Sequence, residues 1–405
     1  MARNVALYPW FKLFQNLIFW QAIWFLFFQK ELSAAEALLL YAVYDVGTTL
    51  LEVPSGYMSD RLGRKPTLAT AMLAGAAGSG LIAFGEGFGV FALAQVLLGM
   101  SAAFASGTDS AFLYESLAAD GREEEVEAEE TRGWQFTLTG LALSAVIGGL
   151  IAQVSFEWAF VGGAMAMVLA LGITLRFVEP THRAEPSAEV QVVSQFSLFR
   201  AAMGKPVLVW LLVLSVLMYG FSHVPFVFGQ PFISEALDTV GWQGEAPLVS
   251  GAVTAAMMLV SVGASLIALA LRQRIGLPAI LLLAFGIQIG LIATLAATNN
   301  TLAIAVLLLR MVPNSFSKPF IVARIQPLLT DAGRATYLSI QSFIGRLLFA
   351  GSLYAASGQA PRGGEMAYDD IQSTLFWYAV VGSVAFVGLA LTARRSRVRQ
   401  ARSIR

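Results

Sequence analysis

The sequence has no cysteine and only two histidines, His182 and His223, among its 405 residues. Without cysteine it forms no disulfide, no thiolate metal site and no thiol nucleophile, and two distant histidines do not favour a zinc site. The G-x-x-x-x-G-K-[ST] phosphate loop and the H-E-x-x-H and G-x-S-x-G motifs are also missing. We therefore expect no metal, no cofactor and no enzymatic activity.

Charge is scarce as well, because only 13% of the residues are charged whereas 57% are hydrophobic. A soluble protein carries about a quarter charged residues. The chain is therefore expected to be an all-α integral membrane protein, since about 20 helical residues cross the hydrocarbon core. Twelve apolar runs are predicted to span the membrane, at 10–29, 34–55, 67–87, 89–112, 135–155, 158–178, 206–233, 247–271, 277–297, 301–325, 336–359 and 371–392.

The distribution of lysine and arginine predicts the orientation of these spans. Basic residues gather on the connections that follow the second, fourth, sixth, eighth and tenth spans. This pattern places those connections and both termini in the cytoplasm. Six arginines lie in the last dozen residues, and we expect this tail to lie against anionic lipid. The predicted location is the cytoplasmic (inner) membrane, with membrane lipid as a partner and no nucleic acid.

A short charged stretch, Gly56 to Lys65, separates the predicted spans 34–55 and 67–87. Its Gly-x-x-x-Asp-Arg-x-Gly-Arg-Lys pattern resembles the signature loop of the major facilitator superfamily, a family of twelve-helix secondary transporters. The resemblance implies two six-helix bundles around a central cavity. The expected parts are an N-terminal bundle at 1–178, a cytoplasmic linker at 179–205, a C-terminal bundle at 206–392 and a basic tail at 393–405.

The same resemblance implies a conformational latch on the cytoplasmic side. Arg64 is expected to pair with Glu115, and Asp60 to face the start of the span 336–359, near Arg334 to Thr336. Such a latch would hold one state of the transporter and would not bind substrate. The latch residues are Gly56, Asp60, Gly63, Arg64 and Glu115.

Two charges are predicted to lie near the middle of the membrane, where an unpaired charge costs at least ~2.5 kcal/mol. Asp45 lies eleven residues before Gly56, and Arg346 lies at a matching depth in the span 336–359. The resemblance implies that their two spans face each other. We expect a charge pair that is made in one state and broken in another; a static buried pair is the alternative.

The predicted span 301–325 carries Arg310 and Lys318 together with Pro313, Asn314 and Pro319. Two cations in a proline-interrupted span indicate a water-lined wall, because unwound backbone is tolerated there only beside a cavity or in protein. An anionic or zwitterionic ligand would find its counter-charge on this wall. Alternatively, Lys318 snorkels to the cytoplasm and Arg310 pairs with a neighbouring helix.

Other polar groups within the spans remain open to two readings. Asp109 is a candidate protonatable group or a plain ion-pair partner. His223, which follows Tyr219 by one helical turn and precedes Pro225, is a candidate proton-responsive group or a packing residue. We count Tyr219, His223 and Asn314 among the candidate binding residues.

The span 135–155 carries Gly140-x-x-x-Ser144-Ala145-x-x-Gly148-Gly149. The pattern resembles the antiporter motif of exporters in this superfamily, although Ala145 stands where that motif has proline. Close helix packing explains the glycines equally well.

These observations predict a monomeric secondary active transporter that moves a small organic solute by alternating access and is coupled to protons. The midspan cations favour an organic anion or a zwitterion. A proton-coupled exporter of lipophilic compounds is the alternative, supported by the aromatic residues at 20–28. Two readings from other classes are a transport-inactive membrane sensor or scaffold and an intramembrane enzyme.

Overall fold

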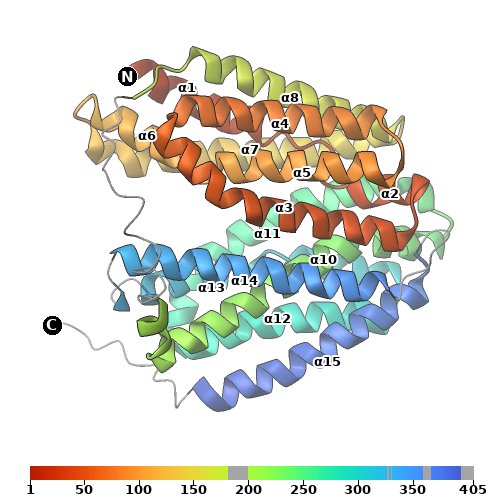
Figure 1. The fold of residues 1–405 in the computed structure, drawn as a ribbon. Coiled ribbons are helices and arrows are strands. Elements are labelled where there is room, and N and C mark those ends of the chain that lie inside the picture. The colour runs from red at the N-terminus through yellow and green to blue at the C-terminus, as the bar shows by residue number, and fades with distance from the viewer. Residues whose placement is uncertain (181–198, 326–327, 330, 359–365, 394–405) are drawn as a thin grey trace. The chain divides into compact units, whose positions relative to one another are not determined.

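The computed structural model describes residues 1–180, 199–325, 328–329, 331–358 and 366–393 (Figure 1). In this part of the chain every regular element is a helix. All of the predicted tail 393–405 except its first residue, and most of the predicted linker 179–205, lie outside the described residues. The helices form two compact units: unit one is Met1–Glu185, Gly244–Ala255 and Ala350–Glu365, and unit two is Pro186–Gln243, Ala256–Phe349 and Met366–Arg405.

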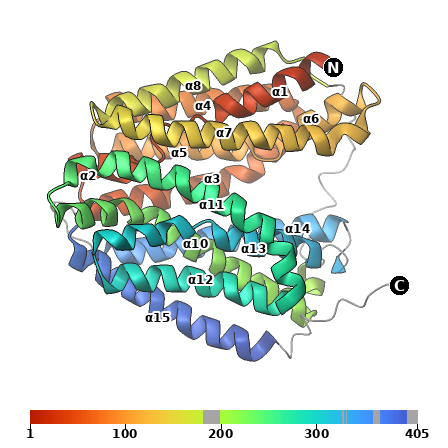
Figure 2. The same ribbon diagram turned by 180° about the vertical axis from the view of Figure 1, so that it is seen from behind.

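Nine helices among the described residues are long and apolar enough to cross a membrane, by length and composition. Their positions follow the predicted apolar runs, because such runs lose no hydrogen bonds when they enter lipid as helices. In unit one, Figure 1 shows α4, α5 and α8 side by side, and Figure 2 shows α1 beside α7 and α8. The nine are α3 (Ala34–Arg61), α4 (Arg64–Phe84), α5 (Gly87–Ala105) with α6 (Thr108–Ala118), α7 (Val126–Ala152), α8 (Phe156–Arg176), α10 (Pro206–Asp238), α11 (Ala246–Ile275), α12 (Leu277–Ala297) and α15 (Tyr368–Ala393).

The three other predicted spans are helical regions too, but two of them are interrupted. The run 10–29 is α1 (Ala2–Gln15) followed by α2 (Trp24–Glu31), and the run 301–325 is the 3₁₀ helix η3 (Thr301–Leu309) followed by α13 (Val312–Ile325). The third, α14 (Asp331–Ser357), is one helix of 27 residues. The run 10–29, which we expected as one span, is therefore two helices, and α5 and α6 likewise divide the run 89–112 at Ser106 and Gly107. The run 301–325 was expected to be interrupted, and it is.

The break between α1 and α2 is held by the glycine-rich face of α7. A Cβ atom on Gly148 would overlap the carbonyl oxygen of Phe19, and one on Gly140 would lie 2.7 Å from the carbonyl oxygen of Leu13. The Gln21 amide donates to the Leu141 carbonyl at 2.8 Å and to the Ser144 hydroxyl at 3.0 Å. The glycine pattern in α7 thus serves close packing in this structure.

The aromatic residues that follow this break pack inside unit one. Trp24, Phe25, Phe27 and Phe28 are all buried, and the Phe27 ring centroid lies 4.7 Å from that of Phe160 on α8. Trp20, in the break itself, stacks on the same Phe160 ring at 5.7 Å. Their apolar character is therefore accounted for by the core of the unit.

The second interruption lies directly before Pro313 and not at Pro319. Asn300 caps η3 by accepting a hydrogen bond from the Leu302 N–H at 2.9 Å, and the chain changes to α-helix at Val312. Pro313 occupies the first turn of α13, where its missing N–H costs no hydrogen bond. The helix continues through Pro319. The expectation that Pro319 interrupts the span was wrong.

The charged stretch 56–65 is shorter as a loop than its sequence indicates. Helix α3 continues to Arg61, so Gly56 lies inside a helix, and α4 begins at Arg64. Only Leu62 and Gly63 connect the two helices, and Gly63 has φ 110° and ψ 165°. A non-glycine residue rarely adopts that conformation, so Gly63 determines where the helices separate.

Candidate functional site

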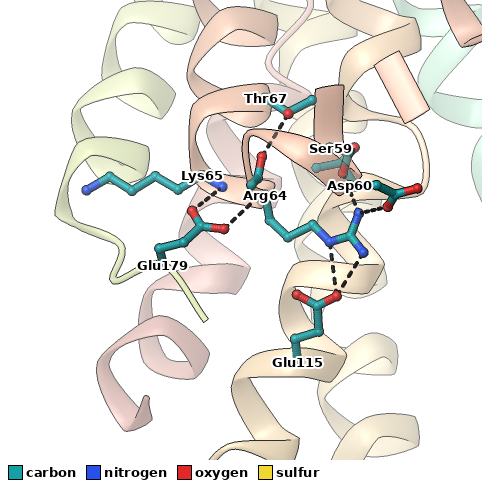
Figure 3. Close-up of polar contacts among 9 residues, drawn as sticks. Ser59, Asp60, Arg64, Lys65, Thr67, Glu115 and Glu179 are labelled. Atoms are coloured by element: carbon teal, nitrogen blue, oxygen red, sulfur yellow. Dashed lines mark hydrogen bonds and ion pairs between the residues drawn. The ribbon is translucent and has the colours of Figure 1, made fainter. Parts of the chain in front are cut away.

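Arg64 lies at the centre of a polar network with Ser59 and Asp60 from the last turn of α3 and Glu115 from α6 (Figure 3). Its Nη1 donates to the Ser59 hydroxyl at 2.6 Å and to Asp60 Oδ1 at 2.8 Å. Its Nε and Nη2 donate to Glu115 Oε1 at 3.0 and 2.8 Å. We call these four residues, with Glu179, the Arg64 network.

The contacts of Arg64 differ in strength because they differ in exposure. The side chains of Arg64 and Glu115 are 11% and 21% exposed, whereas that of Asp60 is 66% exposed. A solvent-exposed pair is worth only about 0–1 kcal/mol, since water and salt screen it. The two-donor contact with Glu115 is shielded and charge-assisted, so it is the principal contact of the guanidinium.

Glu179 is a member of this network that sequence reasoning missed. Its Oε1 accepts the backbone N–H of Arg64 at 2.6 Å and its Oε2 accepts that of Lys65 at 2.8 Å (Figure 3). These are unsatisfied donors at the first turn of α4, where the helix dipole also favours a negative charge. The sequence signal is a carboxylate three residues after the end of α8, at the first position of the predicted linker 179–205.

Two glycines of the expected latch have different surroundings. A Cβ atom on Gly63 would lie 2.6 Å from Glu179 Oε1, so this position accepts no side chain while Glu179 is in place. A Cβ atom on Gly56 would meet nothing within 4 Å. The expected partner of Asp60, at 334–336, has no described side chains, and its contact with Asp60 stays a prediction.

Asp109 forms an ion pair within unit one. Its Oδ2 lies 2.6 Å from Lys12 Nζ, and its Oδ1 accepts the N–H of Ser110 at 2.8 Å. Helix α6 starts at Thr108 because Gly107, with φ 75°, ends the preceding helix. Both side chains are shielded, with 17% and 11% exposed. The geometry is that of the ion-pair alternative, and a role in proton binding stays a prediction.

In unit two, Tyr219 and His223 of α10 lie against Arg346 and Phe349 of α14. The Arg346 guanidinium lies 5.8 Å from the centroid of the Tyr219 ring. The Tyr219 and His223 rings are 4.2 Å apart, and His223 lies 5.4 Å from Phe349. Gly345 permits this approach, because a Cβ atom there would lie 3.2 Å from Tyr219. We call these four residues the Arg346 cluster.

The hydrogen bond of His223 determines which ring nitrogen carries its proton. Nδ1 lies 2.7 Å from the Tyr219 carbonyl oxygen, which only accepts, so Nδ1 must carry a hydrogen. The neutral ring therefore has Nε2 as its acceptor. A ligand hydroxyl or a proton would be received at Nε2.

The three remaining candidates lie on η3 and α13. The Arg310 guanidinium lies 5.1 Å from the centroid of the Phe226 ring of α10. The Asn314 amide donates to the sulfur of Met311 at 3.6 Å, and Lys318 is exposed. Arg346 thus contacts Tyr219, which packs against His223, whereas Arg310 contacts Phe226, three residues further along α10.

Asp45 is buried in α3 of unit one, with 1% of its surface exposed. Its backbone carbonyl accepts the Thr49 hydroxyl at 2.7 Å. Arg346 belongs to unit two. The expected pair between Asp45 and Arg346 stays a prediction.

The helices and the buried charges described above define a polytopic, all-helical integral membrane protein. Solved structures with the same fold include the nucleoside transporter NupG, with a TM-score of 0.77 and 14% identity over 97% of this chain and 100% of that one. An auto-inhibited peptide transporter of the POT family has a TM-score of 0.75 and 12% identity over 100% and 98%. A D-xylose–proton symporter has a TM-score of 0.72 and 15% identity over 96% of each chain.

Residues 10–355 match the family model of the Major Facilitator Superfamily, and the chain belongs to this family. It is therefore a secondary transporter of this type, and members of that kind are not enzymes. A comparison with curated proteins finds no sequence match.

Proposed function

We propose that the protein moves a small organic anion or zwitterion across the membrane by alternating access, coupled to protons. One observation carries the choice of solute. The segments 206–234, 301–325 and 337–357 contain Arg310, Lys318, Arg324 and Arg346 and no Asp or Glu. A membrane region with this excess of positive charge favours a ligand that brings negative charge.

The energetics agree with a ligand-binding role for these cations. A charged side chain at the bilayer centre costs at least ~2.5 kcal/mol, so it is retained where water, a ligand or a protein partner stabilises it. Arg310 and Arg346 each lie over an aromatic ring, which orients the planar guanidinium, and a guanidinium matches the geometry of a carboxylate or phosphate. His223 Nε2 adds an acceptor for a ligand hydroxyl or amine.

Proton coupling has two sources of support. His223 and Asp109 are titratable groups within the helical regions, and a proton symporter is among the proteins of the same fold. The protonated form of either group would change the charge that a nearby ligand meets. We assign proton binding to these residues, with Asp109 released from Lys12 when it is protonated.

We assign the Arg64 network, together with Gly56, to a latch that stabilises one of the two access states. Its buried, multiply bonded guanidinium is suited to a contact that must form and break as a unit. We further propose that the chain forms two six-helix bundles, 1–178 and 206–392, joined by the linker 179–205. It places a monomer in the cytoplasmic membrane, with both termini in the cytoplasm.

The test is transport by the purified protein in liposomes under an imposed pH gradient. Labelled carboxylates, phosphate esters and amino acids would be compared with neutral nucleosides and pentoses. We expect the anionic or zwitterionic class to accumulate, and Arg346→Gln to reduce its uptake at least tenfold. Arg274→Gln, at an exposed position in the last turn of α11, is the matched control. Uptake of neutral solutes alone, unaffected by Arg346→Gln, would refute the proposal.

A further inference from the structure

The three residues that follow α8 each attach to a different part of unit one. We call Phe177, Val178 and Glu179 the strap. The Phe177 ring is buried, and its centroid lies 4.4 Å from that of Phe112 on α6 and 5.7 Å from that of Phe11 on α1. The beginning of the strap is therefore fixed by aromatic packing.

The middle of the strap is held by one side-chain amide. Asn4 of α1 accepts the N–H of Val178 through Oδ1 at 2.9 Å and donates from Nδ2 to the Val178 carbonyl at 2.8 Å. The same Nδ2 donates to the hydroxyl of Ser116 on α6 at 2.9 Å. Asn4 is fully buried. Only an amide side chain offers a donor and an acceptor side by side, so it satisfies both backbone groups of one residue.

The end of the strap is Glu179, which caps α4. Consecutive Cα atoms are about 3.8 Å apart, so fixing the backbone of Val178 restricts where the Glu179 carboxylate reaches. That carboxylate accepts the N–H groups of Arg64 and Lys65. The first of these belongs to the residue whose guanidinium makes the contact with Glu115. The backbone of Arg64 is thus bound by Glu179 of the strap, while its side chain is bound by Glu115 of α6.

We propose that Asn4 is a positioning residue of the Arg64 network: it holds Val178 so that Glu179 caps α4 and places Arg64 against Glu115. Asn4 makes no hydrogen bond to a residue of the Arg64 network and acts on the network through the strap. This inference rests on the latch in the proposed function. It also means that the latch depends on the point where the predicted linker leaves unit one, since residue 179 belongs to both.

The alternative is that Asn4 only stabilises the fold by satisfying buried groups. A double-mutant cycle separates the two, because residues that act through one another are not additive. The readout is amide hydrogen exchange of the segment 62–70 in the full-length protein in nanodiscs, with thermal unfolding measured in parallel. The variants are Asn4→Ala, Glu179→Ala and their combination.

We expect Asn4→Ala to accelerate exchange at Arg64 and Lys65 about tenfold, as for the loss of a typical helix cap. In the Glu179→Ala background it should add no further acceleration there. Additive effects, or acceleration spread evenly over α1, α4 and α6, would overturn the inference. Asn300→Ala, which removes an exposed cap in unit two, should leave the segment 62–70 unchanged.

Two further variants keep the test decisive if Asn4→Ala does not fold. Asn4→Gln retains an amide donor and acceptor but places them one methylene further out, so it should accelerate exchange at Arg64 and Lys65 by a smaller factor than Asn4→Ala. Ser116→Ala removes only the contact with α6 and should have no effect on that segment. Equal effects of the two would contradict the inference.

A second readout tests the latch itself. The chain has no cysteine, so a single cysteine at exposed Tyr114, next to Glu115, reports its environment to a maleimide label. Asn4→Ala and Glu179→Ala should change the labelling rate alike, by severalfold, and not additively. An unchanged labelling rate together with faster exchange would refute the latch, while the cap on α4 would stand. Neither readout requires a substrate, so failure of the solute assignment is detected separately.

Discussion

At the scale of single residues, the contacts of the charged groups in unit one depend on a backbone conformation that only glycine readily adopts. Gly63 combines a backbone conformation that is essentially restricted to glycine with a carboxylate at 2.6 Å from where a Cβ atom would lie. Gly56 belongs to the same sequence motif, yet it has neither constraint. The motif therefore contains glycines that serve different purposes.

We predict that Gly63→Ala lowers the free energy of unfolding by about 1–3 kcal/mol, because alanine must strain the backbone and displace Glu179. Gly56→Ala should leave it unchanged or raise it slightly, since alanine favours a helix. Thermal unfolding of both variants in the same detergent checks this. Equal losses at the two positions would show that the Glu179 cap is not formed.

An exposed pair near the start of α7 gives a prediction about pH. The hydrogen bond from Arg122, at 2.6 Å, lowers the pKa of Glu125. A lowered carboxylate pKa stabilises the fold above the pKa of the unfolded chain, and this contribution is lost as the pH falls through the lowered value. Because water screens the pair, we expect Glu125→Gln to leave the melting temperature unchanged at pH 7. A drop of several degrees would contradict this.

At the scale of elements, the broken helices are the departures from a simple bundle. Between α1 and α2 the backbone is not helical, and it packs closely against glycines of α7. The Gln21 amide also donates a hydrogen bond to the Leu141 carbonyl of α7. In η3 the chain winds more tightly before Arg310. Both breaks lie beside groups that the proposed function uses, Lys12 in one unit and Arg310 in the other. Interrupted helices can position such groups at depths that a regular helix would not allow.

We predict that Gly148→Ala is among the most destabilising single-methyl additions in unit one. The new methyl group would overlap the Phe19 carbonyl, so α1 and α7 must separate, at a cost of about 1–3 kcal/mol. Gly80→Ala in α4, where a Cβ atom meets nothing within 4 Å, is the matched control. The measurement is thermal unfolding, and a harmless Gly148→Ala would show that the break is not packed in this way.

At the scale of the whole molecule, the proposed function requires the two units to exchange contacts during turnover. Asp45 and Arg346 are the charges we assign to that exchange, one in each unit. The assignment comes from their equal predicted depth in the membrane and from the family resemblance. Its test must therefore be functional.

We predict that Asp45→Asn abolishes uptake of the anionic solute, whereas the double variant Asp45→Arg with Arg346→Asp recovers part of it. A swapped pair restores the attraction but not the orientation of each charge toward the ligand, so recovery is incomplete. Uptake in liposomes, normalised to protein that elutes as a single species, is the measurement. Normal uptake by Asp45→Asn would remove the pair from the mechanism.

The sequence alone determined the membrane class, the positions of nearly all helical regions and the family. Long apolar runs have one stable form in lipid, and the motif at 56–65 needs its residues at fixed spacing. Both can therefore be recognised from the sequence without knowledge of tertiary contacts. The pairing of Arg64 with Glu115 also came from the sequence, through the resemblance. The membrane class and the motif follow from local composition and spacing, whereas the pairing was implied only by the resemblance.

Tertiary structure decided the rest, because the deciding contacts join residues far apart in the chain. Nothing in the local sequence shows that Glu179 caps α4, that Asn4 holds Val178, or that Lys12 pairs with Asp109. The break at 16–23 likewise depends on glycines more than a hundred residues away in the sequence. The backbone of the break packs against these glycines, and a side chain at their positions would overlap it. A hydrogen bond across such a separation depends on how the helices pack, and packing is fixed only when the whole unit has folded.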